Sequence, residues 1–255
     1  MRKKLLQIGV PAVCGVLLLI LYITAPWKGG RETPVRVGSK GVDVASLYRS
    51  YTLEEAILYS DLVADVTVTS WLSETVRQSS TQVFDKTFFS VKVNAVIKGE
   101  PLEQFVLMQD GNGLYTRDNY PLFQKDDRLI LFLNKNDRAE DDSYKYDTFY
   151  WIIGSYSTVM DVVTVDKTLY AIDRWGFMTR DEENYDYDEH GNYIEVLDSR
   201  YCFSNLNPSD ARTALRRRDE ADPILATMNN RSNRVLLYDE VLNYAQKINK
   251  GGITE

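Results

Sequence analysis

The run Leu129-Ile130-Leu131-Phe132-Leu133 places five apolar side chains next to one another near the middle of the chain. A short apolar run bounded by polar residues is typical of a strand that is buried on both faces. Asp127 and Arg128 precede this run, and Asn134 follows it. The sequence therefore predicts a central strand at 129–133 with other elements covering both of its faces.

Alternating patterns predict further strands around the central one. Val66 and Val68 alternate with polar neighbours, and a longer alternation runs from about Val83 to Ile97. A period of two is typical of strands with one buried face. The polar residues 71–80 are expected to form a loop. Shorter strands are predicted at Phe105–Gln109, Phe149–Ile153, Ser157–Val165 and Thr168–Ile172, with Asp166-Lys167 as a tight turn.

A capping box opens one helix ahead of these strands. In Thr52-Leu53-Glu54-Glu55 the first and last side chains have the spacing that lets each bond a backbone amide of the other. The predicted helix runs from Leu53 to Tyr59. One short helix followed by several evenly spaced strands predicts a mainly β protein, built as a small antiparallel barrel or sandwich.

The N-terminus carries the features of a membrane anchor. Leu5 to Ala25 is almost unbroken apolar sequence without a charge. At about 1.5 Å per residue, a helix of this length just spans a hydrocarbon core of roughly 30 Å. Arg2, Lys3 and Lys4 precede it, and such a basic flank stays in the cytoplasm. We therefore expect a single-pass protein of the cell membrane whose C-terminal domain is extracytoplasmic.

Two other interpretations of this segment fit the residues less well. A cleaved signal peptide needs small residues before the cut, and Ile23-Thr24-Ala25 does not supply them. A lipoprotein signal would be cut at Cys14, but the apolar run continues past it. An uncleaved transmembrane helix is the prediction.

Composition excludes nucleic acid as a partner. The 255 residues carry a formal net charge of −7, and 44% of them are hydrophobic, which is enough for a folded core. Binding to nucleic acid depends on positive charges that neutralise phosphates. An acidic domain repels those phosphates, so we expect no nucleic acid partner.

The order of the elements resembles a known group of proteins over about Thr52 to Ile172. The motifs that carry the resemblance are Ser60-Asp61, Val96-Ile97-Lys98-Gly99, Tyr120-Pro121-Leu122-Phe123, Asp127-Arg128-Leu129-Ile130-Leu131-Phe132-Leu133 and Tyr150-Trp151-Ile152-Ile153-Gly154. They resemble the OB-like barrel ectodomains, akin to netrin and metalloproteinase-inhibitor modules, of uncharacterised membrane-anchored Gram-positive bacterial proteins. The resemblance implies an OB-like barrel and carries over no catalytic residue. The inhibitor modules use disulfides and an N-terminal cysteine, which Cys14 and Cys202 do not match.

Four parts are expected along the chain. They are a transmembrane anchor at 1–27, a stalk at 28–51, the OB-like β-barrel at 52–173, and an acidic hairpin with a helical extension at 174–255. Helices are predicted at Ser209–Glu220 and Val235–Ile248, the second amphipathic. Within the first of these, Arg216-Arg217-Arg218 is followed at once by acids, which predicts a salt-bridged, solvated face.

No motif in the sequence indicates catalysis. The only histidine, His190, lies in a polar turn, and a serine or cysteine triad would have to include it. One histidine and one cysteine beyond the anchor do not make a typical zinc site. We therefore expect no catalytic residue, no cofactor and no enzyme activity.

The acidic hairpin contains a weak calcium motif. Asp186, Asp188 and Glu189, followed by Gly191, resemble the start of a calcium-binding loop. The bidentate acid that should close such a loop is replaced by Leu197. A solvated acidic hairpin is therefore the prediction, with these three acids as the only metal candidates.

Two functions are left open by these observations. The first is a non-enzymatic module that binds a protein or a cell-envelope polymer through its barrel, which rests on analogy with OB-like barrels. The alternative is a cell-envelope hydrolase that uses a pair of carboxylates. Two acids about 5–10 Å apart in a cleft would favour the hydrolase.

Overall fold

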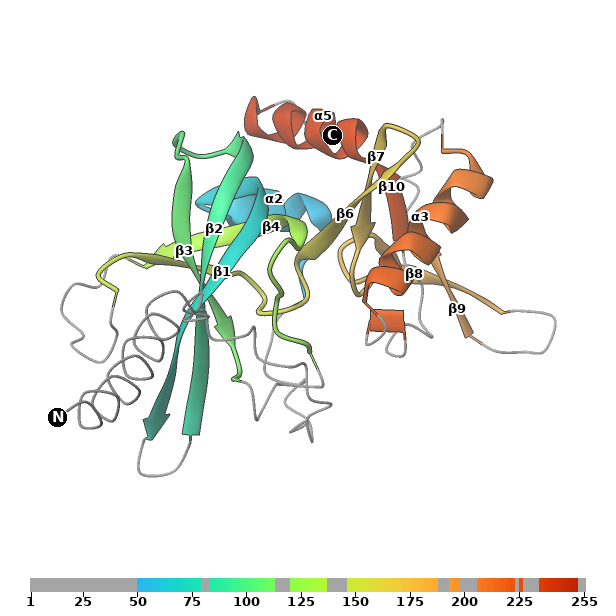
Figure 1. Cartoon of the computed structure of the whole chain (residues 1–255). Helices are drawn as coiled ribbons and strands as arrows, with labels where there is room; N and C mark the ends of the chain where they lie inside the picture. Colours follow the sequence, from blue (N-terminus) through green and yellow to red (C-terminus); the bar gives the residue numbers. More distant parts are fainter. Residues whose placement is uncertain are drawn as a thin grey trace, which may run out of the picture. The chain divides into compact units, whose positions relative to one another are not determined.

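The computed structural model describes residues 50–78, 83–112, 120–136, 146–187, 193–197, 206–222, 225–226 and 234–251. These residues form a mainly β structure with ten strands and three helices (Figure 1). Contacts divide the chain into two units, Met1–Glu32 and Thr33–Glu255, and all described residues belong to the second. The predicted anchor, Leu5–Ala25, lies outside the described residues, and none of the described helices is long and apolar enough to cross a membrane.

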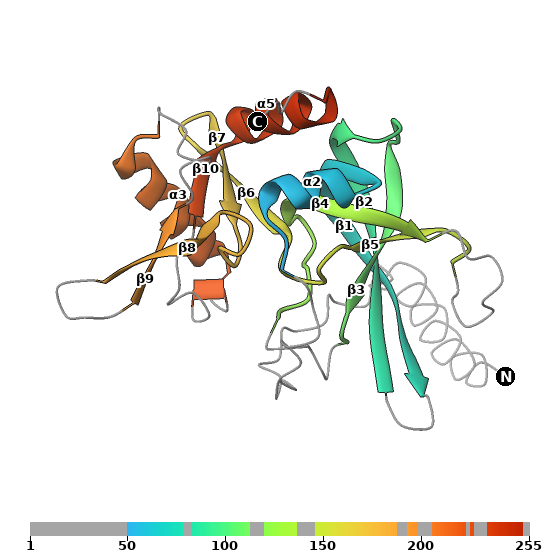
Figure 2. The same ribbon diagram turned by 180° about the vertical axis from the view of Figure 1, so that it is seen from behind.

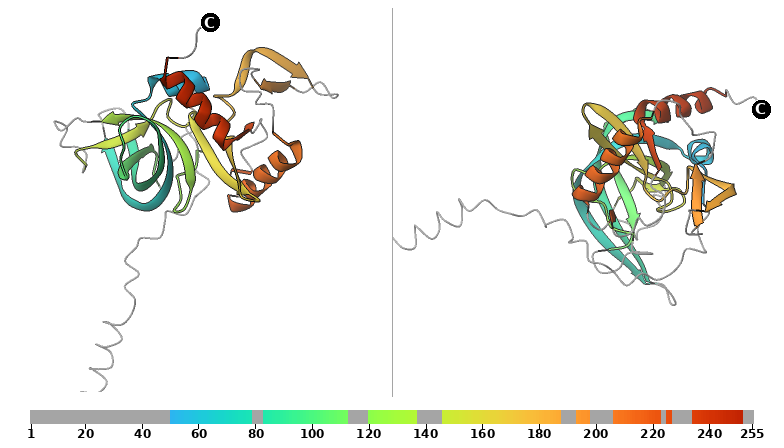
Figure 3. Two further views of the ribbon diagram at one scale, coloured as in Figure 1. Left: turned by 90° about the horizontal axis from the view of Figure 1, so that it is seen from above. Right: turned by 90° about the vertical axis from the view of Figure 1, so that its right-hand side faces the viewer.

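Five strands close into a barrel, which confirms the predicted barrel. Their order is β1-β2-β3-β5-β4, and β1 pairs with β4 as well as with β2, so the sheet returns to its first strand. The left-hand view of Figure 3 shows these strands curling around a common centre. Their bounds are β1 (Leu62–Gln78), β2 (Val83–Lys98), β3 (Gln104–Asp110), β4 (Arg128–Asn136) and β5 (Phe149–Ile152).

One seam of the barrel differs from the predicted antiparallel arrangement. β3 and β5 run parallel, with Leu107 opposite Tyr150 and Met108 opposite Trp151. β5 pairs antiparallel with β4, and β4 pairs antiparallel with β1. β5 therefore runs in the same direction as β1, which is also the direction of β3. Alternation along a strand is the same in parallel and antiparallel pairs, so the pattern of residues could not show this difference.

The apolar run 129–133 forms most of β4, which is the central strand, as predicted. One edge of β4 pairs with β1 along its first six residues. The other edge pairs first with β6 (Val159–Val165) and then with β5. All five side chains of the run are 0% exposed. Burial on both faces explains why the run is continuous rather than alternating.

Alternate residues of β4 build two different cores. Leu129, Leu131 and Leu133 point into the barrel, where they join Phe89, Val91 and Leu107. Ile130 and Phe132 point to the opposite face and pack beneath two helices. These helices are α2 (Leu53–Tyr59) and α5 (Tyr238–Asn249), which lie side by side in Figure 2. A single strand therefore couples the interior of the barrel to its helical cover.

The helix α2 has the predicted bounds and the predicted cap. Thr52 Oγ1 accepts a hydrogen bond of 3.2 Å from the Glu55 amide, and Glu55 Oε2 accepts one of 3.1 Å from the Thr52 amide. Leu53, Ala56 and Ile57 face the core. The capping box thus fixes where the helix begins.

Three strands continue the sheet beyond the closed barrel. β6, β7 (Thr168–Asp173) and β10 (Arg234–Leu237) follow β4 in that order. β6 and β7 are joined at Asp166 and Lys167, whose φ angles are +47° and +73°. Positive φ at both positions is typical of a two-residue hairpin turn, which confirms the predicted tight turn. α3 (Pro208–Ala221) packs on these strands.

Two segments differ from the predicted secondary structure. Residues 71–78, expected in a loop, continue β1 because they pair with the first half of β2 in a long ribbon. Residues 234–237, mostly expected at the start of a helix, form β10 instead. Val235 lies opposite Ile172 of β7, so pairing with a sheet edge overrides the helical period there.

Candidate functional site

An open hollow of about 450 Å³ lies where β2, β3 and β5 meet, and is called the seam hollow below. β3 pairs with β2 along its whole length, but its register with β5 covers only Leu107 and Met108. Among the described strands, residues 104–106 are therefore paired on one edge alone. The hollow is lined by Ser90, Leu102, Gln104, Phe105, Val106, Thr148 and Tyr150.

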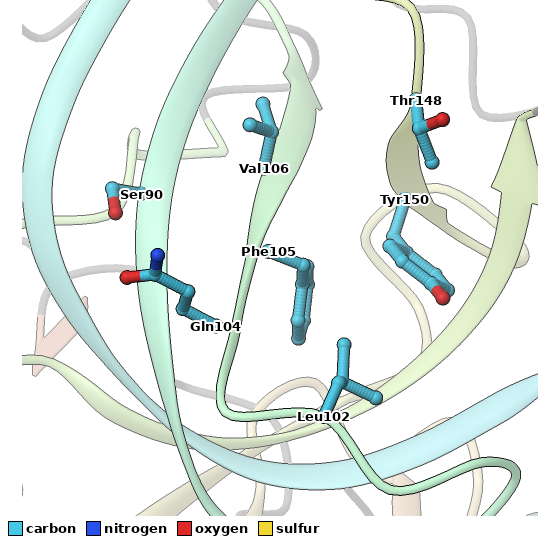
Figure 4. Close-up of a pocket in the computed structure, with 7 residues that line it drawn as sticks. All are labelled: Ser90, Leu102, Gln104, Phe105, Val106, Thr148 and Tyr150. Carbon is cyan, nitrogen blue, oxygen red and sulfur yellow. The ribbon is translucent and has the colours of Figure 1, made fainter.

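The floor of the seam hollow is aromatic and apolar. The ring centroids of Phe105 and Tyr150 are 4.8 Å apart, and their planes meet at 59°. Phe105 belongs to the barrel core, and Tyr150 and Leu102 are partly buried against that core. In Figure 4 these three side chains lie between the ribbons of β3 and β5. The floor is therefore held in place by the interior of the barrel.

The rim of the seam hollow is polar but carries no charge. Gln104 and Thr148 are exposed, and Ser90 is half-buried. Thr69 Oγ1 donates to the Ser90 carbonyl oxygen at 2.9 Å, which fixes the backbone there. The seven lining residues include no carboxylate, amine, imidazole or thiol. The lining therefore offers hydroxyl and amide groups for hydrogen bonding and apolar surface for contact.

A second hollow, of about 260 Å³, lies between the start of β4, β6 and the end of α3, and is called the arginine hollow below. Four arginines and four aspartates line it. They are Arg128, Arg174, Arg217 and Arg218 together with Asp126, Asp127, Asp161 and Asp222. The sequence analysis did not identify this cluster because its members come from four separate segments of the chain.

Asp65 forms a buried network that joins the barrel to α5. Its carboxylate is 0% exposed and accepts from Arg128 Nε and Nη2 at 3.1 and 2.6 Å. Asn94 Nδ2 and the Tyr238 hydroxyl also donate to it, at 2.9 and 2.7 Å. Burial and the bond to Asp65 raise the pKa of Tyr238. These donors satisfy both oxygens of the Asp65 carboxylate, so the network has a structural role.

Asp173 is a buried acid without an arginine. Its Oδ2 accepts from the amides of Met178 and Thr179 and from the Thr179 hydroxyl, at 2.9 to 3.1 Å. Burial raises the pKa of Asp173 to about 6, although these hydrogen bonds act to lower it. Asp173 lines neither hollow, so its proton is not presented to a ligand there.

Of the three predicted calcium candidates, only Asp186 belongs to a described strand. β8 (Arg180–Tyr187) and β9 (Tyr193–Leu197) pair antiparallel, with Asp186 opposite Ile194. Asp188 and Glu189 lie outside the described residues, as does His190. Within the described ranges, no three His, Cys, Asp or Glu side chains are grouped as metal ligands.

The triple arginine of α3 is only partly the solvated face that the sequence predicts. Arg216 is exposed and lies 3.9 Å from Glu220, one helical turn away. Arg217 Nη1 donates to the Thr164 carbonyl oxygen at 2.7 Å. Arg218 is 4% exposed and paired with Asp219. Neighbouring arginines on one helix thus face different surroundings, because α3 packs against β6.

Comparisons with known protein families, with characterised proteins and with solved structures return no match to this chain. The functional argument therefore rests on the two hollows and their chemistry. The seam hollow was not predicted from the sequence. The one local signal for it is the pair of aromatic residues, Phe105 and Tyr150, at the start of two short strands.

Proposed function

We propose that this chain is a non-enzymatic binding module that holds an uncharged segment of a cell-envelope polymer in the seam hollow of an OB-like barrel. The strand order β1-β2-β3-β5-β4 with a parallel β3–β5 seam supports the OB-like assignment. OB-folds bind oligonucleotides and oligosaccharides on the face of strands 2 and 3. The seam hollow lies beside those two strands here.

Charge favours an oligosaccharide over an oligonucleotide. The lining of the seam hollow has no lysine or arginine, and the chain carries a net charge of −7. Binding to single-stranded nucleic acid combines aromatic stacking with a positively charged groove that follows the phosphates. Only the aromatic half of that combination is present, so the ligand class is a neutral saccharide.

The observation that carries this proposal is the aromatic floor beneath a rim of amide and hydroxyl groups. A sugar ring has apolar C–H faces, which pack on aromatic rings, and hydroxyls, which both donate and accept hydrogen bonds. Phe105 and Tyr150 supply the rings. Gln104, Thr148 and Ser90 supply groups that can do both kinds of hydrogen bonding.

The location follows from the N-terminal segment. We propose that Leu5–Ala25 anchors the chain and that residues 28–51 carry the barrel away from the outer face of the membrane. The full-length protein should then remain in the membrane fraction through high-salt and carbonate washing. Recovery of the washed protein in the soluble fraction would contradict the anchor without bearing on the seam hollow.

Isothermal titration tests the ligand. The full-length chain in detergent micelles is titrated with the hexamer of N-acetylglucosamine. Tyr150→Ala removes the floor and should weaken binding about tenfold, equal to about 1.4 kcal/mol. Gln104→Ala, at an exposed position, should weaken it less. Trp151→Ala is the matched control, since Trp151 is 38% exposed and does not line the hollow.

Three outcomes would contradict the proposal. They are no saturable binding, binding that Tyr150→Ala and Gln104→Ala leave unchanged, and an equal loss in Trp151→Ala. Thermal melting of each variant shows whether it is folded. The hydrolase alternative gains no support from the seam hollow, because no acid lines it.

A further inference from the structure

Arg174 carries an unused hydrogen-bond donor at the arginine hollow. The side chain follows β7 and is 1% exposed. Its Nε lies 3.1 and 3.2 Å from the two carboxylate oxygens of Asp161, and Nη2 also donates to Asp161. The remaining nitrogen, Nη1, is buried and has no hydrogen-bond partner. A buried cationic donor without an acceptor is costly. Because Arg174 lines the arginine hollow, a group in the hollow can supply that acceptor.

The aromatic rings beside Arg174 do not supply that acceptor. The guanidinium carbon lies 5.3 Å from the ring centroid of Phe123 and 5.9 Å from that of Tyr120. Ring faces attract a cation, but as hydrogen-bond acceptors they are much weaker than an oxygen atom. Burial lowers the pKa of Arg174, but the charge and hydrogen bonds of Asp161, together with Tyr120 and Asp127, outweigh that effect, so the pKa is raised and the group stays charged.

Three of the four acids of the hollow accept hydrogen bonds from described donors. Asp161 is bound by Arg174, and Asp127 Oδ2 accepts from the Gln124 amide at 2.8 Å. Asp222 Oδ1 accepts from the Leu225 amide at 3.4 Å. Arg174 Nη1 therefore has no acceptor among the described acids that line the hollow.

A second cation, Arg217, also lines the hollow and is partly exposed. Arg217 is 45% exposed, and its Nη2 lies 3.7 Å from Asp166, too far for a strong bond. The hydrogen bond from Arg217 Nη1 to the Thr164 carbonyl oxygen fixes the position of this side chain. At about 260 Å³, the space is several times the roughly 30 Å³ that one water occupies in the liquid.

We propose that the arginine hollow binds an oxyanion, a carboxylate or phosphate group, which accepts from Arg174 Nη1 and is closed over by Arg217. Guanidinium groups suit such anions because their planar donors match two oxygens at once. This site is separate from the seam hollow and shares no lining residue with it. A failure of saccharide binding would therefore leave this proposal standing.

The test is titration of the full-length chain in detergent micelles with inorganic phosphate and, separately, with acetate, at constant ionic strength. Thermal melting is followed in parallel, since a ligand that binds the folded state raises the melting temperature. Arg217→Gln should weaken binding at least tenfold through loss of one charge-assisted contact. Arg216→Gln is the matched control, because Arg216 is its exposed neighbour and does not line the hollow.

The expected result is saturation by at least one anion, weakened in Arg217→Gln and unchanged in Arg216→Gln. Binding of phosphate alone assigns a phosphate ester as the natural group, and binding of acetate alone assigns a carboxylate. No saturation and no rise in melting temperature with either anion would overturn the proposal, leaving water as the occupant. An equal loss in both arginine variants would also overturn it, since it would show a diffuse charge effect.

Discussion

Asp65 and Asp161 lie on either side of the same strand, and each is a buried acid paired with an arginine. Asp65 is opposite Ile130 on one edge of β4, and Asp161 is opposite Leu129 on the other. Their surroundings differ in how many donors reach them. Asp65 accepts from three side chains that belong to β2, β4 and α5, whereas the Asp161 carboxylate accepts from Arg174 alone among the described residues.

The difference separates a structural joint from a binding site. The acid of the Asp65 network is filled by donors from three elements, so it holds those elements together. The Asp161–Arg174 pair leaves Nη1 without an acceptor. Buried ion pairs contribute little net stability unless the remaining donors and acceptors are also satisfied. The unsatisfied pair is therefore the one where a ligand can add most.

The largest effect is expected from removing the acid of the unsatisfied pair. Asp161→Ala leaves Arg174 charged and 1% exposed, which should cost about 3–5 kcal/mol of unfolding free energy. Asp65→Ala should cost less, about 2–4 kcal/mol, because a third of the Arg128 side chain already reaches solvent. Denaturant melts of both variants measure this, with exposed Asp147→Ala as the control. If Asp65→Ala lowers the unfolding free energy more than Asp161→Ala does, the expected order is wrong.

Asp173 extends the comparison to a buried acid with no cation. Its folded pKa of about 6 lies above the ordinary value of 3.8, so folding favours the protonated form. The stability that this protonation contributes is complete below about pH 4 and is lost as the pH rises past about 6. The change is on the order of 3 kcal/mol. Unfolding free energies at several pH values, compared with Asp173→Asn, isolate it.

In Asp173→Asn this component of the pH dependence should be absent, because the amide does not titrate. The amide oxygen can still accept from the Met178 and Thr179 backbone, so the loop keeps its main bonds. Parallel pH profiles in the two proteins would show that Asp173 titrates normally.

A smaller effect is expected from one donor of the Asp65 network. Tyr238→Phe removes only the hydroxyl that donates to Asp65 at 2.7 Å. The acid keeps Arg128 and Asn94, so the loss should be about 1–2 kcal/mol. Chemical denaturation measures the change, and hydrogen exchange in α5 should report it locally. If neither the unfolding free energy nor the exchange rates change, the Tyr238–Asp65 hydrogen bond does not contribute to holding α5 on the barrel.

The smallest effect is expected at the surface of α3. Arg216→Gln breaks a pair with Glu220 whose side chains are 68% and 69% exposed. Exposed pairs at this spacing contribute at most about 0.5 kcal/mol. A loss above about 1 kcal/mol would show that Arg216 makes a contact beyond this pair. Thermal melting at low and high salt is the measurement.

Local patterns were sufficient for the parts of the fold whose causes are local. The capping box placed α2, and the run 129–133 identified β4 as buried on both faces. The Asp166-Lys167 turn was visible because two polar residues separate two predicted strands, Ser157–Val165 and Thr168–Ile172. In each case the residues that determine the structure are neighbours in sequence.

Features that depend on distant partners were missed. Val235 and Leu236 form β10 because they pair with the free edge of β7. The local sequence around them contains no signal for that edge. Both hollows combine residues from segments far apart in the chain. The parallel β3–β5 seam, which opens the seam hollow, follows from the path of the whole chain rather than from either strand.

The bond from Tyr238 to Asp65 joins residues 173 positions apart. During synthesis at about 5–20 residues per second, Asp65 waits roughly 10–35 s for this partner. Until then the face of β4 that carries Ile130 and Phe132 has no α5 to cover it. Of the two helices, only α2 covers that face before α5 has emerged, and a product truncated before Arg234 would leave the α5 side of it open to proteases and to aggregation.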